Sequence, residues 1–252
     1  MNGLDGKVAV VLGASQPDSM GGTIARRFVE AGARVIVAGR RRAAVEELAR
    51  QIGATPVTCD ITKEADVAAL ADSAVQTHGR LDIAVNCCGE PIMGYIAETD
   101  EATLRRATDL HFVGPFFFLK HMAARMGRGG SIVTLSSITA TLMFPNHAAY
   151  MGAKAGTDHL VRIAAVEYGK KGIRVNSVSP GFTQSPMTAD FLKIPGVREA
   201  FEKQIPLEHL NTVDDVAAAV VWLSSEGAYV SGQNIHVSGG NQLTHLPALE
   251  LG

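Results

Sequence analysis

The chain has 252 residues, of which 46% are hydrophobic and 19% charged, and its formal net charge at pH 7 is −2. This length and this apolar content are typical of one α/β domain with a large buried sheet. Because the net charge is small and the basic residues are dispersed, the sequence predicts neither a nucleic-acid partner nor a membrane surface.

The apolar runs and the cysteines favour a cytoplasmic protein. No run reaches the roughly 18 apolar residues that span a membrane, and the first residues lack the cationic and apolar segments of a signal peptide. The three cysteines, Cys59, Cys87 and Cys88, lie in strand-like segments. An odd number with two adjacent thiols argues against a disulfide framework and for small packing residues in a reducing compartment. We therefore expect a cytoplasmic protein without a metal site.

Short continuous apolar runs alternate with longer segments of helical period along the chain. The runs predict strands over residues 8–12, 34–38, 55–58, 83–86, 131–135, 174–178 and 234–237. The periodic segments predict helices over residues 21–31, 43–51, 64–76, 101–125, 148–168 and 213–223. Repeated strand–helix units form a parallel sheet with right-handed crossovers. The predicted fold is a single α/β domain over residues 1–252, a Rossmann-type doubly wound parallel sheet with helices on both faces.

One segment interrupts this alternation. Residues 182–208 hold three prolines, Pro186, Pro195 and Pro206. A long connection of this kind in a compact domain is usually functional. We therefore expect residues 182–208 to run over the surface as a substrate lid.

The first predicted strand leads into the stretch LGASQPDSMGGTIA, residues 12–25. A glycine-rich turn between a strand and a helix can bind a dinucleotide pyrophosphate through backbone N–H groups and the positive end of the helix. Gly13 permits the tight turn, and Gly21 and Gly22 permit close approach of a ligand or a strand. The spacing differs from G-x-G-x-x-G, so a flexible loop at a helix start is the alternative interpretation.

The stretch AAYMGAKAG, residues 148–156, contains Tyr150 and Lys154 four positions apart. On a helix these two side chains share one face. A phenol titrates at about 10, and a nearby ammonium favours the phenolate. Tyr150 can then serve as the base in alcohol oxidation or the acid in ketone reduction. Two unrelated surface residues are the alternative interpretation of this spacing.

The glycine-rich turn, the Tyr150–Lys154 pair and a serine thirteen residues before Tyr150 resemble the short-chain dehydrogenase/reductase family, and the resemblance covers the whole chain. It implies an oxidoreductase with a nicotinamide cofactor. It also implies that Ser137 hydrogen-bonds the substrate oxygen and holds it against Tyr150, with Ser136 as the neighbouring alternative.

The turn itself departs from the family pattern T-G-x-x-x-G-x-G. Leu12 replaces the threonine, Ser19 replaces the middle glycine, and two residues are inserted. This form is more similar to the divergent turn of bacterial enoyl reductases in the same superfamily. The resemblance implies that the longer loop still wraps the pyrophosphate and that the Ser19 hydroxyl donates to it.

The second predicted strand ends in VIVAGRRR and bears on the choice of dinucleotide. An acid there binds the ribose hydroxyls of NAD, and an arginine suits the extra phosphate of NADP. Gly39 stands where members that use NAD have the acid, and Arg40 follows it. A guanidinium grips a phosphate with two hydrogen bonds, so we expect NADP(H), with NAD(H) as the other possibility. Against this, Arg40 could be a solvated helix start, and no basic residue stands in the turn beside Ser15.

Two further stretches resemble cofactor-binding motifs of the family. In CDIT, residues 59–62, Asp60 matches the acid that binds the adenine amino group, although it could equally cap a helix at Thr62. In VNCCG, residues 85–89, Asn86 and Gly89 match the family's N-N-A-G. Cys87 replaces the second asparagine, so the role of that side chain is not carried over.

His111, in DLHFVGPFFF, stands where the family has an asparagine. The family asparagine kinks its helix and steadies a water in the proton relay to the lysine. A histidine titrates at about 6.5 and could carry protons itself. It could equally only satisfy the helix kink, and both interpretations stay open.

The stretch VSPGFTQSPM, residues 178–187, resembles the family's turn under the nicotinamide. The resemblance implies that Pro180 and Gly181 shape this floor and that Thr183 and Ser185 hydrogen-bond the carboxamide. The predicted catalytic residues are Ser137, Tyr150, Lys154 and His111. The predicted cofactor-binding residues are Gly13, Ser15, Ser19, Met20, Gly21, Arg40, Asp60, Ile61, Asn86, Gly89, Tyr150, Lys154, Pro180, Gly181, Thr183 and Ser185.

The residues expected around the substrate are mostly apolar. They favour a hydrophobic or cyclic alcohol or ketone over a charged sugar, although methionine and phenylalanine at such positions are as often packing residues. The predicted substrate residues are Pro91, Met93, Thr139, Met143, Phe144, His147, Met187 and Phe191.

The predicted function is an NADP(H)-dependent oxidoreductase that interconverts a secondary alcohol and a ketone by hydride transfer. An enoyl reductase is the first alternative, but that group spaces its tyrosine and lysine seven apart, and Thr157 stands at that position. A dinucleotide-binding sensor without turnover is the second. The resemblance implies a small-molecule substrate and a homotetramer or homodimer, assembled through the helices around residues 112–122 and 153–166 and the closing strand.

Overall fold

The computed structural model describes residues 3–247, and its centre is a sheet of seven parallel strands in the order β3-β2-β1-β4-β5-β6-β9. Every strand predicted from the apolar runs is present, with its ends shifted by at most two residues. The fold class predicted from the sequence is thereby confirmed. The strands are β1 (Val8–Leu12), β2 (Arg34–Gly39), β3 (Thr55–Thr58), β4 (Ile83–Asn86), β5 (Gly130–Leu135), β6 (Ile173–Pro180) and β9 (Asn234–Val237).

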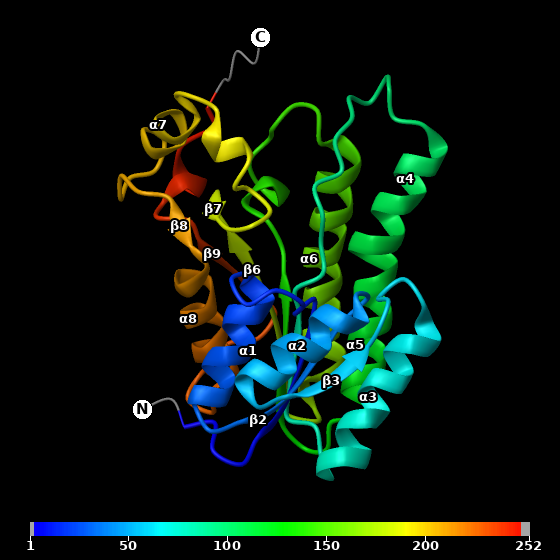
Figure 1. The fold of residues 1–252 in the computed structure, drawn as a ribbon. Helices are drawn as coiled ribbons and strands as arrows, with labels where there is room; N and C mark the ends of the chain where they lie inside the picture. The colour runs from blue at the N-terminus through cyan, green and yellow to red at the C-terminus, as the bar shows by residue number, and fades with distance from the viewer. Residues whose placement is uncertain (1–2, 248–252) are drawn as a thin grey trace.

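Eight α-helices accompany these strands in the described part of the chain. They are α1 (Met20–Glu30), α2 (Arg42–Ile52), α3 (Glu64–His78), α4 (Glu101–Thr108), α5 (Gly114–Arg125), α6 (Ala148–Gly169), α7 (Val197–Glu202) and α8 (Val213–Ser224). Helices α1, α2 and α8 cover one face of the sheet, and α3, α5 and α6 cover the other (Figure 1).

The side chains of each central strand alternate between two hydrophobic clusters, one on each face of the sheet. In β1, Val8, Val10 and Leu12 belong to the cluster with α3, α5 and α6. Ala9 and Val11 belong to the cluster with α1, α2 and α8. A strand that is buried on both faces has a continuous apolar sequence, which is why the apolar runs predicted these strands.

The strand order reverses between β1 and β4. The chain winds from β1 to β3 toward one edge and from β4 to β9 toward the other. In doubly wound sheets, ligands bind in the crevice beyond the carboxyl ends of the strands at this switch point. The glycine-rich turn follows β1 and the VNCCG stretch spans the end of β4, so both lie at the predicted crevice.

The helix predicted over residues 101–125 is divided into three pieces. A π-helical turn, η1 (Asp109–Val113), separates α4 from α5, and such turns are frequent at functional sites. The hydroxyl of Thr157 on α6 donates to the backbone carbonyl of His111. The helix therefore has the irregularity expected at His111, and Thr157 satisfies its backbone rather than the imidazole.

The segment predicted as a lid has local structure of its own. It contains α7, a 3-10 turn at Phe191–Lys193 and strand β7 (Thr183–Gln184), which pairs with β8 (Asn211–Thr212). A third hydrophobic cluster lies inside it, built on Val197, Phe201, Ile205 and Leu210. We call residues 182–210 the cap segment; in Figure 1 its helix α7 stands beyond the carboxyl edge of the sheet.

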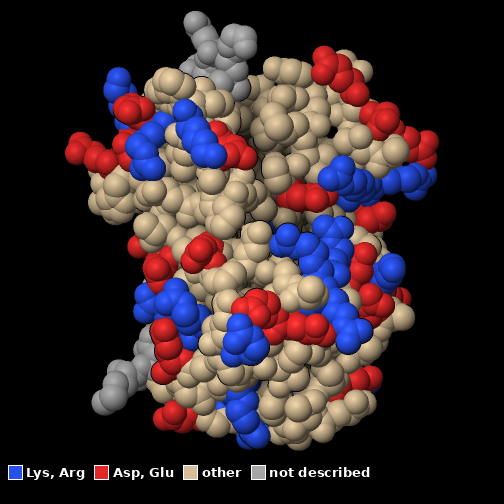
Figure 2. Space-filling view, viewed as in Figure 1, with Lys and Arg blue, Asp and Glu red and all other residues tan. Residues whose placement is uncertain are grey.

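Charged side chains are mixed on the surface. On the face shown in Figure 2, basic and acidic groups are interspersed rather than gathered into one field of a single sign. No helix within residues 3–247 is long and apolar enough to cross a membrane. The three cysteines are free thiols, with Cys59 buried and Cys87 and Cys88 half-buried.

Candidate active site

A cavity of about 410 Å³ opens at the carboxyl edge of the sheet, between the ends of β4, β5 and β6 and the cap segment. Met143 is 72% exposed and is not among the lining residues, whereas the next residue, Phe144, lines the cavity. A contact of Met143 with the substrate therefore stays a prediction. The other predicted substrate residues do line the cavity: Pro91, Met93, Thr139, Phe144, His147, Met187 and Phe191.

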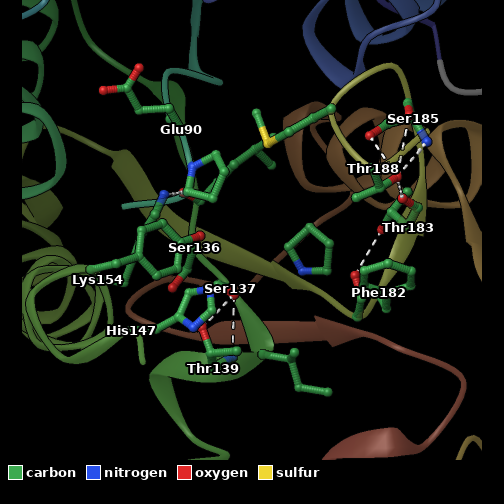
Figure 3. Close-up of a pocket in the computed structure, with 18 of the residues that line it drawn as sticks. Glu90, Ser136, Ser137, Thr139, His147, Lys154, Phe182, Thr183, Ser185 and Thr188 are labelled. Carbon is green, nitrogen blue, oxygen red and sulfur yellow. Dashed lines mark hydrogen bonds between the residues drawn. The ribbon is translucent and has the colours of Figure 1, made fainter. Parts of the chain in front are cut away.

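Two serines follow β5, and their hydroxyls have different surroundings. Ser136 is buried, and its hydroxyl donates to a carboxylate oxygen of Asp158 at 2.8 Å. The Ser137 oxygen lies 2.9 Å from the Thr139 hydroxyl and accepts the Thr139 N–H at 3.2 Å, at the cavity surface (Figure 3). Ser137 is thus the serine in position to meet a substrate oxygen.

Helix α6 brings Tyr150 and Lys154 to the same cavity. Lys154 is buried, and its Nζ donates to the backbone carbonyl of Leu135 at 2.7 Å. The same nitrogen lies 5.8 Å from the centre of the Tyr150 ring. The hydrogen bond joins α6 to the end of β5, so Ser137, Tyr150 and Lys154 meet although they come from two elements.

Burial shifts the titration of both α6 side chains. It raises the pKa of the Tyr150 phenol, with the Ser137 hydroxyl working in the opposite direction. The sequence predicted that the Lys154 ammonium favours the phenolate; in the structure this ammonium is directed at the Leu135 carbonyl, and burial is the largest influence on the pKa of the phenol. Burial also lowers the pKa of Lys154 to about 8, against the negative charge of Asp158, which raises it.

His111 packs its ring edge-to-face against Tyr150, with ring centroids 4.8 Å apart. Its Nε2 donates to the backbone carbonyl of Glu90 at 3.0 Å, so Nδ1 is an acceptor. This Nδ1 is buried without a hydrogen-bond partner among the described residues. Burial and the charge of Lys154 lower the pKa of His111 to about 3. Both Nδ1 and the Lys154 Nζ lie within 4 Å of the position that a Cβ would occupy on Gly89.

The glycine-rich turn is held together by local hydrogen bonds of Ser19 and by close backbone packing at its glycines. Ser19 caps α1: its oxygen accepts the Gly22 N–H at 3.1 Å, and its hydroxyl donates to the Gln16 carbonyl at 2.7 Å. Gly13 has a φ of 90°, and a Cβ there would lie 2.6 Å from the backbone carbon of Cys87. A Cβ on Gly22 would collide with the Gln16 carbonyl in the same way. The glycines thus serve close backbone packing, and donation from Ser19 to a phosphate stays a prediction.

Two arginines directly follow the end of β2. Arg40 is exposed directly after Gly39, the last residue of the strand. The guanidinium of Arg41 donates to the Ser15 hydroxyl at 3.0 Å. Sequence reasoning missed Arg41, which brings a cation to Ser15 from outside the turn. Its place in the run of three arginines was the only available signal.

Three predicted cofactor residues have structural roles in the loops after β3 and β4. Asp60 accepts the Thr62 N–H at 3.1 Å and the Thr62 hydroxyl at 2.8 Å. Because α3 begins only at Glu64, Asp60 orders a local turn and does not cap the helix. Ile61 is part of the buried core. Asn86 is buried, and its side-chain oxygen accepts the Cys88 N–H at 3.0 Å.

The loop after β6 forms the opposite wall (Figure 3). The Thr183 hydroxyl donates to the Gly181 carbonyl at 2.8 Å. Thr188, which sequence reasoning missed, donates its hydroxyl to the Thr183 carbonyl at 2.6 Å and accepts the Ser185 N–H at 3.1 Å. These bonds hold Pro180, Gly181, Thr183 and Ser185 together as one lining segment.

Other apolar lining residues were also missed, and three of them belong to the cap side of the cavity. Phe182 stacks on Phe201 with ring centroids 4.0 Å apart, and both line the cavity. Leu246 joins them from the C-terminal segment, which is tied down where the side chain of Asn241 donates to the Gln204 carbonyl at 3.1 Å. The spacing of Val197, Phe201 and Ile205 is a helical signal that could have revealed α7. The return of Leu246 to the cavity had no signal in the sequence.

The residues present fit a nicotinamide dinucleotide. The predicted cofactor residues lie along one edge of the sheet, from Arg40 after β2 to Ser185 after β6. The capped N-terminus of α1 offers backbone N–H groups in the crevice. At the other end of this line, Lys154 and the unpartnered Nδ1 of His111 are buried polar groups beside the cavity.

Known proteins are similar to this chain in sequence and in fold. Residues 13–242 match a family model described as "Enoyl-(Acyl carrier protein) reductase". The chain is 38% identical over 244 residues to the mitochondrial borneol dehydrogenase of Lavandula x intermedia, covering 94% of this chain and 91% of that one. It is 36% identical over 254 residues to the 7alpha-hydroxysteroid dehydrogenase of Escherichia coli, covering 94% of each. A solved short-chain type dehydrogenase/reductase from Mycobacterium ulcerans superposes with a TM-score of 0.92 at 33% identity, covering 98% of this chain and 93% of that one.

Proposed function

The chain belongs to the short-chain dehydrogenase/reductase family, and on that premise we propose that it interconverts hydrophobic cyclic alcohols and their ketones with NADP(H). Membership makes it an NAD(P)-dependent oxidoreductase of secondary alcohols. The observation that supports the finer proposal is the meeting of Ser137, Tyr150 and Lys154 at one largely apolar cavity.

The proposed chemistry divides the work between cofactor and protein. The bound nicotinamide accepts or supplies the hydride and, when oxidised, brings a positive charge to the site. Tyr150 takes the hydroxyl proton during alcohol oxidation and returns it during ketone reduction. Ser137 holds the substrate oxygen against Tyr150. Burial raises the pKa of the Tyr150 phenol and so favours its protonated form. Formation of the phenolate therefore depends on the positive charge of protonated Lys154 nearby.

His111 acts in this proposal as a neutral acceptor. A pKa of about 3 keeps the imidazole uncharged near neutral pH, so it does not carry a proton as imidazolium. Its buried Nδ1 instead accepts a hydrogen bond from a water or an ammonium hydrogen on the Lys154 side. The ring also supports Tyr150 by edge-to-face packing.

Arg40 and Arg41 support the choice of NADP(H). The Arg41 guanidinium at Ser15 and the exposed Arg40 beside it in the chain suit a phosphate on the adenosine ribose. Arg40→Ala should raise the KM for NADP by about tenfold and leave the KM for NAD nearly unchanged. Arg128, exposed before β5 at the opposite edge of the sheet, is the control: Arg128→Ala should change neither. Equal use of both dinucleotides, unaffected by Arg40→Ala, would contradict the NADP proposal.

The cavity walls support a hydrophobic substrate. Phe182, Phe191 and Phe201 form one aromatic group on the cap side, and Phe144 and Met93 face it from the other loops. Two relatives are named for borneol and for hydroxysteroids, which are cyclic secondary alcohols. The substrate proposed here belongs to the same class.

An enoyl reductase is the second candidate, since the matched family model carries that description and the opening turn is similar to that group. Thr157 in place of a lysine speaks against it. Nicotinamide absorbance should be followed with cyclic alcohols, cyclic ketones and enoyl thioesters in parallel. Turnover of alcohols and ketones supports the proposal, turnover of enoyl thioesters alone supports the alternative, and dinucleotide binding without turnover supports a sensor.

We also propose that the chain forms a homo-oligomer. Apolar side chains are exposed along the α4–α5–α6 layer: Leu104, Phe116, Ile163 and Val166, the last of them 80% exposed. Exposed apolar residues grouped on neighbouring helices favour association. Light scattering should report a dimer or tetramer, and Val166→Glu should shift it toward the monomer; a wild-type monomer would contradict this proposal.

A further inference from the structure

Asp158 continues the line of active-site residues along α6. Lys154 lies one helical turn beyond Tyr150, and Asp158 lies one turn beyond Lys154, so the three share a helix face. Asp158 is only 8% exposed. Its Oδ2 accepts the Ser136 hydroxyl at 2.8 Å and the side-chain amide of Asn234 at 2.7 Å. None of the chemistry described above uses this carboxyl group.

The surroundings leave Asp158 without a cation in direct contact. Its Oδ1 is buried and has no hydrogen-bond partner within residues 3–247. Lys154, on the neighbouring turn, donates to the Leu135 carbonyl and not to the carboxylate. The two buried groups therefore influence each other through space. The other titratable groups around the pair are Tyr150 and Arg162 on α6, Cys87 and Cys88 after β4, and His111 in η1.

We propose that Asp158 is a positioning residue that keeps Lys154 charged and holds the end of β5 against α6. This inference rests on the proposed function of Ser137, Tyr150 and Lys154. The positioning part follows from two hydrogen bonds to consecutive residues: Lys154 binds the Leu135 carbonyl, and Asp158 binds the Ser136 hydroxyl. Ser137 is the next residue, so both bonds fix its distance from Tyr150.

The electrostatic part follows from the burial of Lys154. Burial lowers the pKa of Lys154 to about 8, and the charge of Asp158 is the largest influence that raises it. Burial also raises the pKa of Asp158, and the hydroxyl of Ser136 and the charge of Lys154 act against that rise. The nearest other acidic groups are the thiols Cys87 and Cys88, whose pKa values are raised by burial, so they stay neutral near pH 8. Without the carboxylate, Lys154 would lose its proton at a lower pH, and the ammonium that stabilises the phenolate would be lost with it.

Asp158→Asn tests the charge with little change of shape. The amide oxygen can still accept from Ser136 and Asn234, and the amide NH₂ would take the place of the buried Oδ1. We expect the alkaline midpoint of kcat/KM for ketone reduction, which needs both Tyr150 and Lys154 protonated, to move down by about one pH unit. Below pH 7 the activity should change little.

Asp82→Asn is the matched control. Asp82 is 9% exposed and accepts the Val8 N–H at 2.9 Å, at the amino edge of the sheet. This variant also loses a buried carboxylate, so it should lower the melting temperature without moving the alkaline midpoint. If Asp158→Asn does not fold, Asp158→Ser, which removes the same charge with a smaller side chain, is measured in its place.

The outcomes separate the inference from the proposed function. A folded Asp158 variant that binds the dinucleotide and keeps the wild-type midpoint overturns the inference, as does an equal loss of activity at every pH. Absence of alcohol or ketone turnover by the wild-type protein overturns the proposed function itself. A downward shift in the Asp158 variant, absent in Asp82→Asn, supports the inference.

Discussion

The two walls of the cavity are held in place in different ways. One wall, formed by the end of β5 and the first turns of α6, is fixed by buried polar contacts to the sheet, such as Lys154 to Leu135. The other wall, the cap segment, packs mainly on its own hydrophobic cluster around Phe201. The first is part of the domain core, and the second is a local unit placed over it.

This difference separates two tasks. Catalytic groups need fixed geometry, which rigid helices and strands provide. A small local cluster opens more easily than the main core, so the cap segment suits substrate entry and selection by shape. Changes on the α6 wall should therefore alter kcat and its pH dependence, whereas changes on the cap wall should alter KM.

The largest expected effect is on the α6 wall. Tyr150→Phe removes the proton donor and acceptor while keeping the ring that packs on His111. Because general acid–base catalysis contributes about 10²–10⁴-fold, kcat should fall by about a thousandfold. Steady-state kinetics with a cyclic alcohol measure this, and dinucleotide binding by fluorescence should stay unchanged. Wild-type turnover by this variant would remove Tyr150 from the chemistry.

A substitution in the cap segment should change KM for the alcohol more than kcat. Phe201→Ala removes the ring that stacks on Phe182 at 4.0 Å and leaves a cavity in the small cluster. Phe→Ala changes in cores cost about 3–5 kcal/mol. We expect this cost to exceed the free energy by which the small cluster stabilises the folded cap segment. We expect KM for the alcohol to rise at least about tenfold, with a smaller change in kcat, and hydrogen exchange to speed up in residues 191–210.

A matched substitution in the main core sharpens this test. Phe118 on α5 is fully buried between α5 and the sheet. Phe118→Ala should destabilise the whole domain, with one lower melting transition and exchange rising throughout. If Phe201→Ala gave the same global pattern, the cap segment would be part of the main core, and the distinction between the walls would be lost.

The features that could be predicted from the sequence are those set by residues close together in the chain. The strands were found because burial on both faces makes their runs continuously apolar, as in β1. Ser137, Tyr150 and Lys154 were found because a short spacing and a strand end bring them together. Each of these signals is local in the chain.

The features that were missed depend on contacts between distant segments. Arg41 reaches Ser15 across the turn, and Leu246 returns to the cavity from the end of the described chain. The direction of the Tyr150 pKa shift depends on burial by several elements, which no spacing encodes. Met143 and Phe144 are adjacent and similar, and only the loop conformation decides which one faces the cavity.

The pH profile should follow the α6 wall alone. Burial lowers the pKa of Lys154 to about 8, and the protonated form is the active one. Ketone reduction, in which Tyr150 donates a proton and burial favours the protonated phenol, should therefore fall as the pH rises through about 8, by about tenfold for each further unit. Kinetics from pH 6 to 10 measure this midpoint, and Phe201→Ala should keep it. A midpoint that moved in the cap variant would show that the cap segment controls the environment of Lys154.

The smallest effect is expected at His111, where the structure separates two roles that the sequence left open. A neutral imidazole and an amide both offer an acceptor and a donor, so His111→Asn should stay within about threefold of wild type in kcat/KM. His111→Leu offers neither and leaves the Glu90 carbonyl without its donor, so it should lose about tenfold. Because burial and Lys154 lower the pKa of His111 to about 3, the wild-type profile should show no limb between pH 5 and 7 that depends on this residue. A limb near pH 6.5 that vanished in His111→Asn would instead mean that the imidazole carries the proton as a cation, and the neutral-acceptor role would have to be given up.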